Sequence, residues 1–76
     1  MFSDKIIALR TSKGLSQERF AERLGMSRQA VQRWENGTAF PDLENLMRIA
    51  KTFGVSLDWL GDLSSVQSAD ALRRQD

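Results

Sequence analysis

The segment from residue 16 to residue 37, SQERFAERLGMSRQAVQRWENG, constrains the fold of this chain more than any other. Its apolar residues recur three and four positions apart, which predicts two short helices at about 17–24 and 28–36. Ser16 and Ser27 precede these helices and are favourable N-caps, because a serine hydroxyl accepts a hydrogen bond from an early backbone N–H. The segment therefore predicts two helices that follow each other closely.

The connection between these two helices is short and contains a glycine. Phe20, Ala21 and Leu24 form an apolar stripe on the first helix, and the small Ala21 allows the second helix to cross nearby. Gly25 suits a turn that needs a positive φ, and Met26 can place an apolar side chain under that turn. Two short helices joined in this way are typical of a helix-turn-helix.

The second helix combines an apolar side with a polar arc. Ala30, Val31 and Trp34 fall on one side, whereas the opposite arc holds Arg28, Gln29, Gln32, Arg33 and Asn36. Arginine pairs bidentately with guanine, and glutamine with adenine, in the DNA major groove. An ordinary solvated helix face would have a similar composition. We interpret Arg28, Gln29, Gln32 and Arg33 as candidate base-reading residues.

The remaining residues predict three more helices and no strand of weight. These lie at about 3–13, 43–53 and 57–61, with Ser3, Asp42 and Ser56 as their expected N-caps. The first helix is expected to bury Ile6 and Leu9, with Ile7 beside them. The fourth is expected to bury an apolar stripe made of Leu43, Leu46, Met47, Ala50 and Phe53.

The amino-acid composition argues against several classes of function. The 76 residues include no cysteine and no histidine, which argues against a zinc site and against histidine-dependent catalysis. We find no nucleophile–base pair and no phosphate loop, so we expect neither an enzyme nor a cofactor. No run approaches the roughly 20 apolar residues of a membrane span. The first residues do not resemble a signal peptide, so a cytoplasmic, nucleoid-associated protein is expected.

The charges are unevenly distributed, although the net charge is only +1. Residues 1–37 hold seven basic and four acidic side chains, a balance of +3, and residues 38–63 hold two basic and four acidic ones, a balance of −2. The basic half contains the candidate reading helix, as attraction to DNA phosphates requires. The loop at 38–42 offers no cation, which predicts a shallow dependence of DNA affinity on salt.

Several of these residues together resemble the phage-repressor and Cro family (XRE-type) of helix-turn-helix domains. The resemblance extends over about residues 2–62 and rests on Gln17, Ala21, Gly25, Val31 and the run Trp34-Glu35-Asn36-Gly37. It implies an all-α, five-helix, lambda-repressor-like domain at 1–63. It also implies that the domain binds double-stranded operator DNA, usually as a homodimer. For a two-fold dimer we expect an operator with an inverted repeat, and repression is the default outcome.

The resemblance also implies roles for Asn36 of the polar arc and for residues outside this arc. Phosphate contacts are expected from Gln17, Ser27, Asn36, Arg10 and Thr38. For Gln17 the free N–H groups of a helix start add support. Arg10 and Glu35 are expected to form a partly buried ion pair, although an exposed pair of little energetic value is the alternative.

The C-terminal part leaves alternatives open. The resemblance places a dimer contact at Leu57, Trp59 and Leu60, but Trp59 could instead cover the core. The tail at 64–76 could extend the dimer contact or serve as a linker. A protein-interaction module, such as an antitoxin that binds a partner protein and regulates its own gene, is the alternative function.

Overall fold

The computed structural model describes residues 1–61, and in this range the chain forms five helices and no strand. They are α1 (Phe2–Ser12), α2 (Gln17–Leu24), α3 (Arg28–Asn36), α4 (Leu43–Phe53) and α5 (Leu57–Gly61). The expected all-α, five-helix architecture is confirmed. The expected tail at 64–76 lies outside the described residues.

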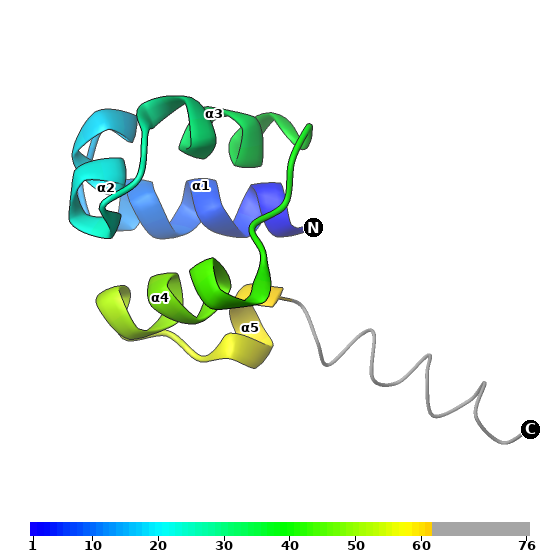
Figure 1. The fold of residues 1–76 in the computed structure, drawn as a ribbon. Helices are drawn as coiled ribbons and strands as arrows, with labels where there is room; N and C mark the ends of the chain where they lie inside the picture. Colours follow the sequence, from blue (N-terminus) through cyan, green and yellow to red (C-terminus); the bar gives the residue numbers. More distant parts are fainter. Residues whose placement is uncertain (62–76) are drawn as a thin grey trace, which may run out of the picture.

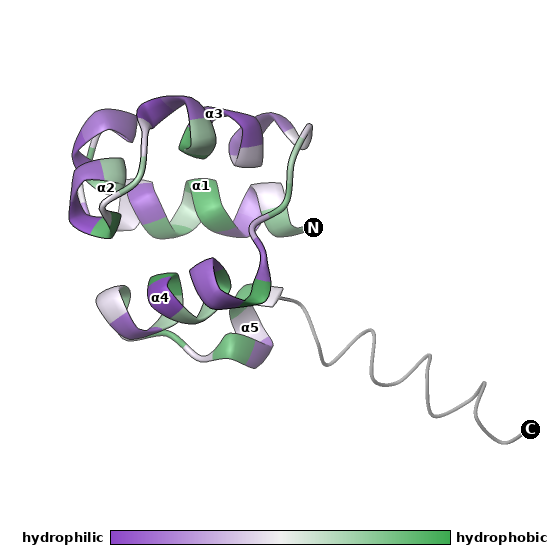
Figure 2. Cartoon of the chain, viewed as in Figure 1, coloured by the Kyte–Doolittle hydropathy of each residue, from purple (hydrophilic) through white to green (hydrophobic). Residues whose placement is uncertain are grey.

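The helices are arranged around α1. Figure 1 shows α1 between α3 on one side and α4 with α5 on the other, while α2 lies across one end. Twelve apolar side chains form one core, to which all five helices contribute: Phe2, Ile6, Leu9, Phe20, Ala21, Leu24, Val31, Trp34, Leu46, Ile49, Phe53 and Leu60. The outer side of α3 is largely hydrophilic in Figure 2, whereas α1 is hydrophobic in its middle.

The expected caps of the second, third and fourth helices are present. The Ser16 hydroxyl accepts a hydrogen bond from the Arg19 N–H, and the Asp42 carboxylate accepts one from the Asn45 N–H at 2.9 Å. Gly25 and Gly37 end α2 and α3 in the left-handed conformation, with φ of 68° and 78°. These signals are local, which is why the sequence predicted the bounds of α2 and α3.

The start of α1 differs from the prediction. The helix begins at Phe2, with Met1 in the cap position and no side-chain cap, so Ser3 lies within the helix and not before it. Phe2 is buried, and its ring packs edge-on against Phe40, with 4.7 Å between the ring centroids. Burial of this aromatic ring outweighs the modest free energy of a serine cap.

The buried side of α4 also differs from the prediction. The helix buries Leu46, Ile49 and Phe53, whereas Leu43 and Met47 are 63% and 47% exposed. Both sets of residues have helical spacing, so periodicity could not distinguish between them. The stacking of the Phe20 and Phe53 rings, with 4.5 Å between their centroids, joins α2 to α4. Ile49, which is fully buried in the core, is the residue that distinguishes the observed side from the predicted one.

Within residues 1–61, every helix is too short or too polar to span a lipid bilayer.

Candidate nucleic-acid interface

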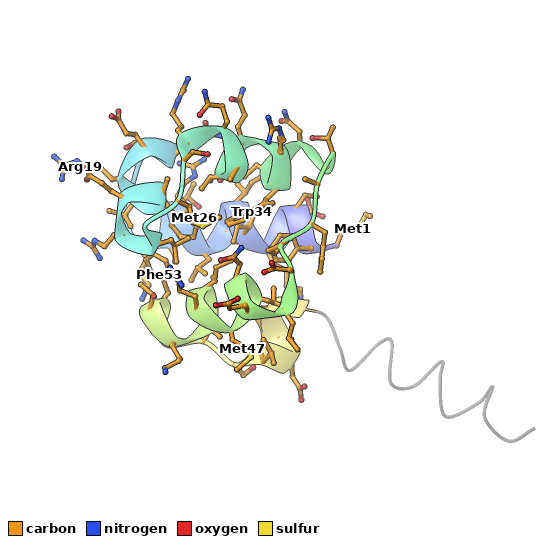
Figure 3. The ribbon with its side chains drawn as sticks, viewed as in Figure 1. Met1, Arg19, Met26, Trp34, Met47 and Phe53 are labelled. Carbon is orange, nitrogen blue, oxygen red and sulfur yellow. The ribbon has the colours of Figure 1, made fainter. Side chains whose placement is uncertain are left out.

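The side of α3 that faces away from the core is a continuous polar surface. Its four candidate base-reading residues, Arg28, Gln29, Gln32 and Arg33, are all exposed. Val31 and Trp34 are buried on the opposite side of the helix, and Figure 3 shows Trp34 pointing from α3 toward α1. Within residues 1–61 no hydrogen bond or ion pair engages the four side chains. Their polar groups are therefore available to a ligand.

The turn between α2 and α3 is fixed by backbone and side-chain hydrogen bonds. The Met26 N–H donates to the Ala21 carbonyl at 2.9 Å, and the Met26 side chain packs against the core. From α4, Arg48 Nη1 donates to the Leu24 carbonyl at 3.3 Å. Sequence reasoning missed this contact, because nothing near Arg48 in the chain indicates which carbonyl it reaches.

Arg10 and Glu35 lie together, at a point where α1 meets the end of α3. Arg10 Nε donates to Glu35 Oε2 at 2.6 Å, and Arg10 Nη2 donates to Glu35 Oε1 at 3.1 Å. The side chains are only 18% and 6% exposed, so the pair is partly buried. The hydrogen bond to Glu35, opposed by desolvation and aided by the carboxylate charge, raises the pKa of Arg10 above its ordinary value. Arg10 Nη1 also donates to the Leu15 carbonyl at 2.9 Å.

Gln17, the first residue of α2, belongs to the same group of contacts. Its Nε2 atom donates to Glu35 Oε1 at 3.0 Å, and the Gln17 side chain is half-buried. Glu35 belongs to α3, and its carboxylate therefore accepts hydrogen bonds from both α1 and α2. The sequence suggested the ion pair through resemblance, but gave no sign that Gln17 joins it.

The other residues expected to contact phosphates differ in the hydrogen-bond donors that they have available. Ser27 is exposed, and its oxygen accepts from the Ala30 N–H at 3.1 Å, which leaves its O–H group to donate. The Asn36 side chain is exposed, with no hydrogen-bond partner within the described chain. Thr38 donates both its hydroxyl and its backbone N–H to the Arg33 carbonyl, so it has no free donor for a phosphate.

The three residues expected at a dimer contact have different environments. Trp59 is 40% exposed, and Lys5 Nζ lies 5.1 Å from the centroid of its ring. Leu57 is half-buried against the core. Leu60 has no exposed surface, so the expectation that it faces a second subunit is wrong: it packs inside its own domain.

Comparison with known proteins shows which family this chain belongs to. A family model described as helix-turn-helix matches residues 6–60, which include all five helices in whole or in part. The chain belongs to the Cro/C1-type helix-turn-helix family.

The relatives are named as transcriptional regulators. The chain is 46% identical over 59 residues to the HTH-type transcriptional activator BcrR of Enterococcus faecalis, which is 78% of this chain and 29% of BcrR. It is 45% identical over 60 residues to the SPbeta prophage-derived uncharacterized HTH-type transcriptional regulator YonR of Bacillus subtilis, 79% of this chain and 56% of YonR. The Cryptic phage CTXphi transcriptional repressor RstR of Vibrio cholerae is 39% identical over 57 residues, 75% of this chain and 51% of RstR. The matched region thus spans about half of YonR and RstR, and less of BcrR.

Membership of the helix-turn-helix family means that the chain carries a domain of the DNA-binding type found in these transcriptional regulators. It also relates the geometry to that activity. In this family α2 and α3 are the two helices of the motif, and the second helix of such a motif enters the major groove. The exposed polar surface of α3 is therefore the candidate DNA interface.

Proposed function

We propose that this protein is a sequence-specific regulator that reads double-stranded DNA with α3. The observation that carries the proposal is the combination on one helix of a buried side and a free polar surface. Arg28, Gln29, Gln32 and Arg33 supply the donors and acceptors that pair with guanine and adenine edges. Arg28 and Gln29 contribute most, because the N-terminal end of a reading helix lies deepest in the groove.

Phosphate contacts set the register of α3 on the DNA. The exposed Asn36 amide, the free O–H of Ser27 and the start of α2 at Gln17 are the proposed donors. The guanidinium of Arg10 is held by Glu35 and the Leu15 carbonyl, which favours a structural role for Arg10 over a phosphate contact. Contacts of this kind carry no base preference but position the groups that do.

We propose that two copies bind an inverted repeat. A two-fold axis would place two α3 helices in successive major grooves about 34–36 Å apart. The exposed part of Trp59, with Leu57 beside it in α5, is the proposed contact between the copies. A dimer bound over a promoter would block polymerase, so we expect repression, as the name of RstR states for that relative, whereas BcrR is named as an activator. We expect this action in the cytoplasm, at the nucleoid.

Selection of binding sites from a random duplex pool at about physiological salt tests this function. We expect enrichment of an inverted repeat whose half-sites lie about one helical turn apart. Arg33→Ala should blur the preference at one base pair of each half-site, whereas Lys51→Ala, an exposed basic residue of α4, serves as the matched charge control. Enrichment of a single half-site would contradict the dimer. No enrichment by a folded protein would contradict sequence-specific reading.

A second candidate function has one observation in its favour. Leu43 and Met47 lie one turn apart on α4 and expose apolar surface, and Figure 3 shows Met47 on the side away from α1. Exposed apolar residues of this kind are found where a partner protein binds. An interaction module that also regulates its own gene, as an antitoxin does, would use this side of α4. A protein that selects no DNA site in the experiment above would favour it.

A further inference from the structure

The Glu35 carboxylate is the point at which three helices meet. It stands at the penultimate position of α3 and is nearly buried. Arg10 of α1 donates two hydrogen bonds to it, and Gln17 of α2 donates one. The ion pair alone accounts for the burial of Glu35, because a charge at such a site needs a partner. It does not account for the contact with Gln17.

The chemistry of the Gln17 side chain indicates a role for its contact with Glu35. A carboxamide nitrogen carries two N–H donors that point in different directions. One of them is directed at Glu35 Oε1, so the second N–H is available to another acceptor. Since a carboxylate only accepts hydrogen bonds, it also fixes which way round the amide lies, with Nε2 toward Glu35. The side chain is thereby held in one orientation before any ligand arrives.

We propose that Glu35 is a positioning residue for a phosphate contact made by Gln17. This inference rests on the proposed function, in which the start of α2 meets the DNA backbone. Gln17 then bridges two anionic oxygens, one of Glu35 and one of a phosphate, through the two N–H groups of a single nitrogen. The end of the reading helix and the phosphate contact are thus joined by one hydrogen bond.

Two physical features make this arrangement favourable for binding. A free glutamine has three rotatable side-chain bonds, and ordering it on DNA costs free energy that a side chain already held does not lose. The negative charge of Glu35 would repel a phosphate, but the Arg10 guanidinium lies 2.6 Å from it and offsets that charge. Arg10 therefore contributes to DNA binding without touching DNA.

A double-mutant cycle in DNA affinity tests the proposal. Binding to a short random-sequence duplex is measured for the wild type, Gln17→Met, Glu35→Gln and the double variant. The temperature is chosen so that circular dichroism shows all four folded. Gln17→Met keeps the length of the side chain but removes both donors. We expect it to weaken affinity about tenfold per protomer, as the loss of one hydrogen bond to a charged group does.

The decisive result is the effect of Glu35→Gln in the two backgrounds. With Gln17 present we expect a loss of about threefold to tenfold in DNA affinity. In the Gln17→Met background we expect little further loss, although the free energy of unfolding still falls because the Arg10 pair is weakened. An equal loss in both backgrounds would mean that Glu35 acts only by packing α3, and would overturn the proposal. Failure of the wild type to bind any duplex would instead overturn the proposed function itself.

A measurement on the wild type alone serves if Glu35→Gln does not fold. Side-chain ¹⁵N relaxation of the Gln17 carboxamide in the absence of DNA should show a group as rigid as the helix backbone. The exposed Gln29 and Gln32 carboxamides, which have no partner within residues 1–61, are internal controls and should be mobile. A Gln17 carboxamide as mobile as these two would overturn the proposal.

Discussion

Arg10 of α1 and Glu35 of α3 are joined by two hydrogen bonds, from Nε to Oε2 at 2.6 Å and from Nη2 to Oε1 at 3.1 Å. The two residues are 25 positions apart in the chain, and their contact fixes the end of α3 against α1. Because the proposed DNA-reading surface lies on α3, the pair sets the orientation of that surface relative to the rest of the domain.

Removal of one member of this pair should destabilise the domain more than removal of both. Arg10→Met leaves the Glu35 charge nearly buried without its cation, and we expect the free energy of unfolding to fall by about 3 kcal/mol. Arg10→Met combined with Glu35→Leu should recover a large part of that loss. Urea denaturation of the three proteins measures the difference. A double variant less stable than Arg10→Met would contradict the account.

The contribution of Arg10 to stability should not change between about pH 7 and about pH 10. Glu35 raises the pKa of Arg10 above its ordinary value. A raised pKa contributes stability below the unfolded-state value, and this stability is lost only as the pH rises through the folded-state value. Both values lie far above pH 10. The stability difference between wild type and Arg10→Met, measured by denaturation at the two pH values, should therefore be equal.

Gly25 should be sensitive to the conformation of its backbone and insensitive to steric crowding. Its φ is +68°, and a Cβ atom there would meet only Arg48 Nη1, at an ordinary contact distance of 3.8 Å. We expect Gly25→Ala to cost about 1–2 kcal/mol of stability, from the left-handed backbone alone. Gly25→Asn should cost less, since asparagine tolerates this region. Thermal denaturation of both variants compares them, and equal losses would point to crowding instead.

The two sides of α4 should respond differently to substitution. Ile49 is fully buried and Leu43 is 63% exposed. We expect Ile49→Ala to cost about 2–5 kcal/mol of stability and Leu43→Gln to cost within about 0.5 kcal/mol. The two losses of stability are compared by denaturation at low protein concentration, where association contributes least. A large cost for Leu43→Gln that appears only at higher protein concentration would show that the exposed side of α4 is covered by a second copy.

Substitutions on the reading surface should change DNA preference without changing the fold. Gln29→Ala and Arg33→Ala should each cost about 1–3 kcal/mol in affinity for the selected site, and relax the preference at one position. Their thermal stability should stay close to that of the wild type, because both side chains are exposed and unpartnered within residues 1–61. A uniform loss of affinity on every DNA sequence would assign these residues to phosphates.

The sequence predicted most of the structural features that depend on residues close to one another in the chain. Caps, terminal glycines and apolar spacing gave the bounds of α2 through α5, because each of these signals acts within a turn or two. They failed at the start of α1, where burial of Phe2 against Phe40 decides, and on α4, where two apolar stripes compete and packing selects the one with Ile49.

The candidate site was predictable to the same degree. The polar surface of α3 followed from helical periodicity alone, and the Arg10–Glu35 pair followed only from resemblance. The contacts of Gln17 with Glu35 and of Arg48 with the Leu24 carbonyl join residues 18 and 24 positions apart. Contacts between distant residues depend on how helices cross, which spacing in the sequence does not encode.

The freedom of the reading surface has an evolutionary consequence. Four side chains of α3 have no hydrogen bond or ion pair within residues 1–61, whereas the capping and ion-pair residues around them hold the helix in place. Under the proposed role, a descendant can therefore exchange Arg28, Gln29, Gln32 or Arg33 for another polar residue at little cost in folding. Regulators built in this way can diverge toward new operators through single substitutions, while the selection that maintains the scaffold continues unchanged.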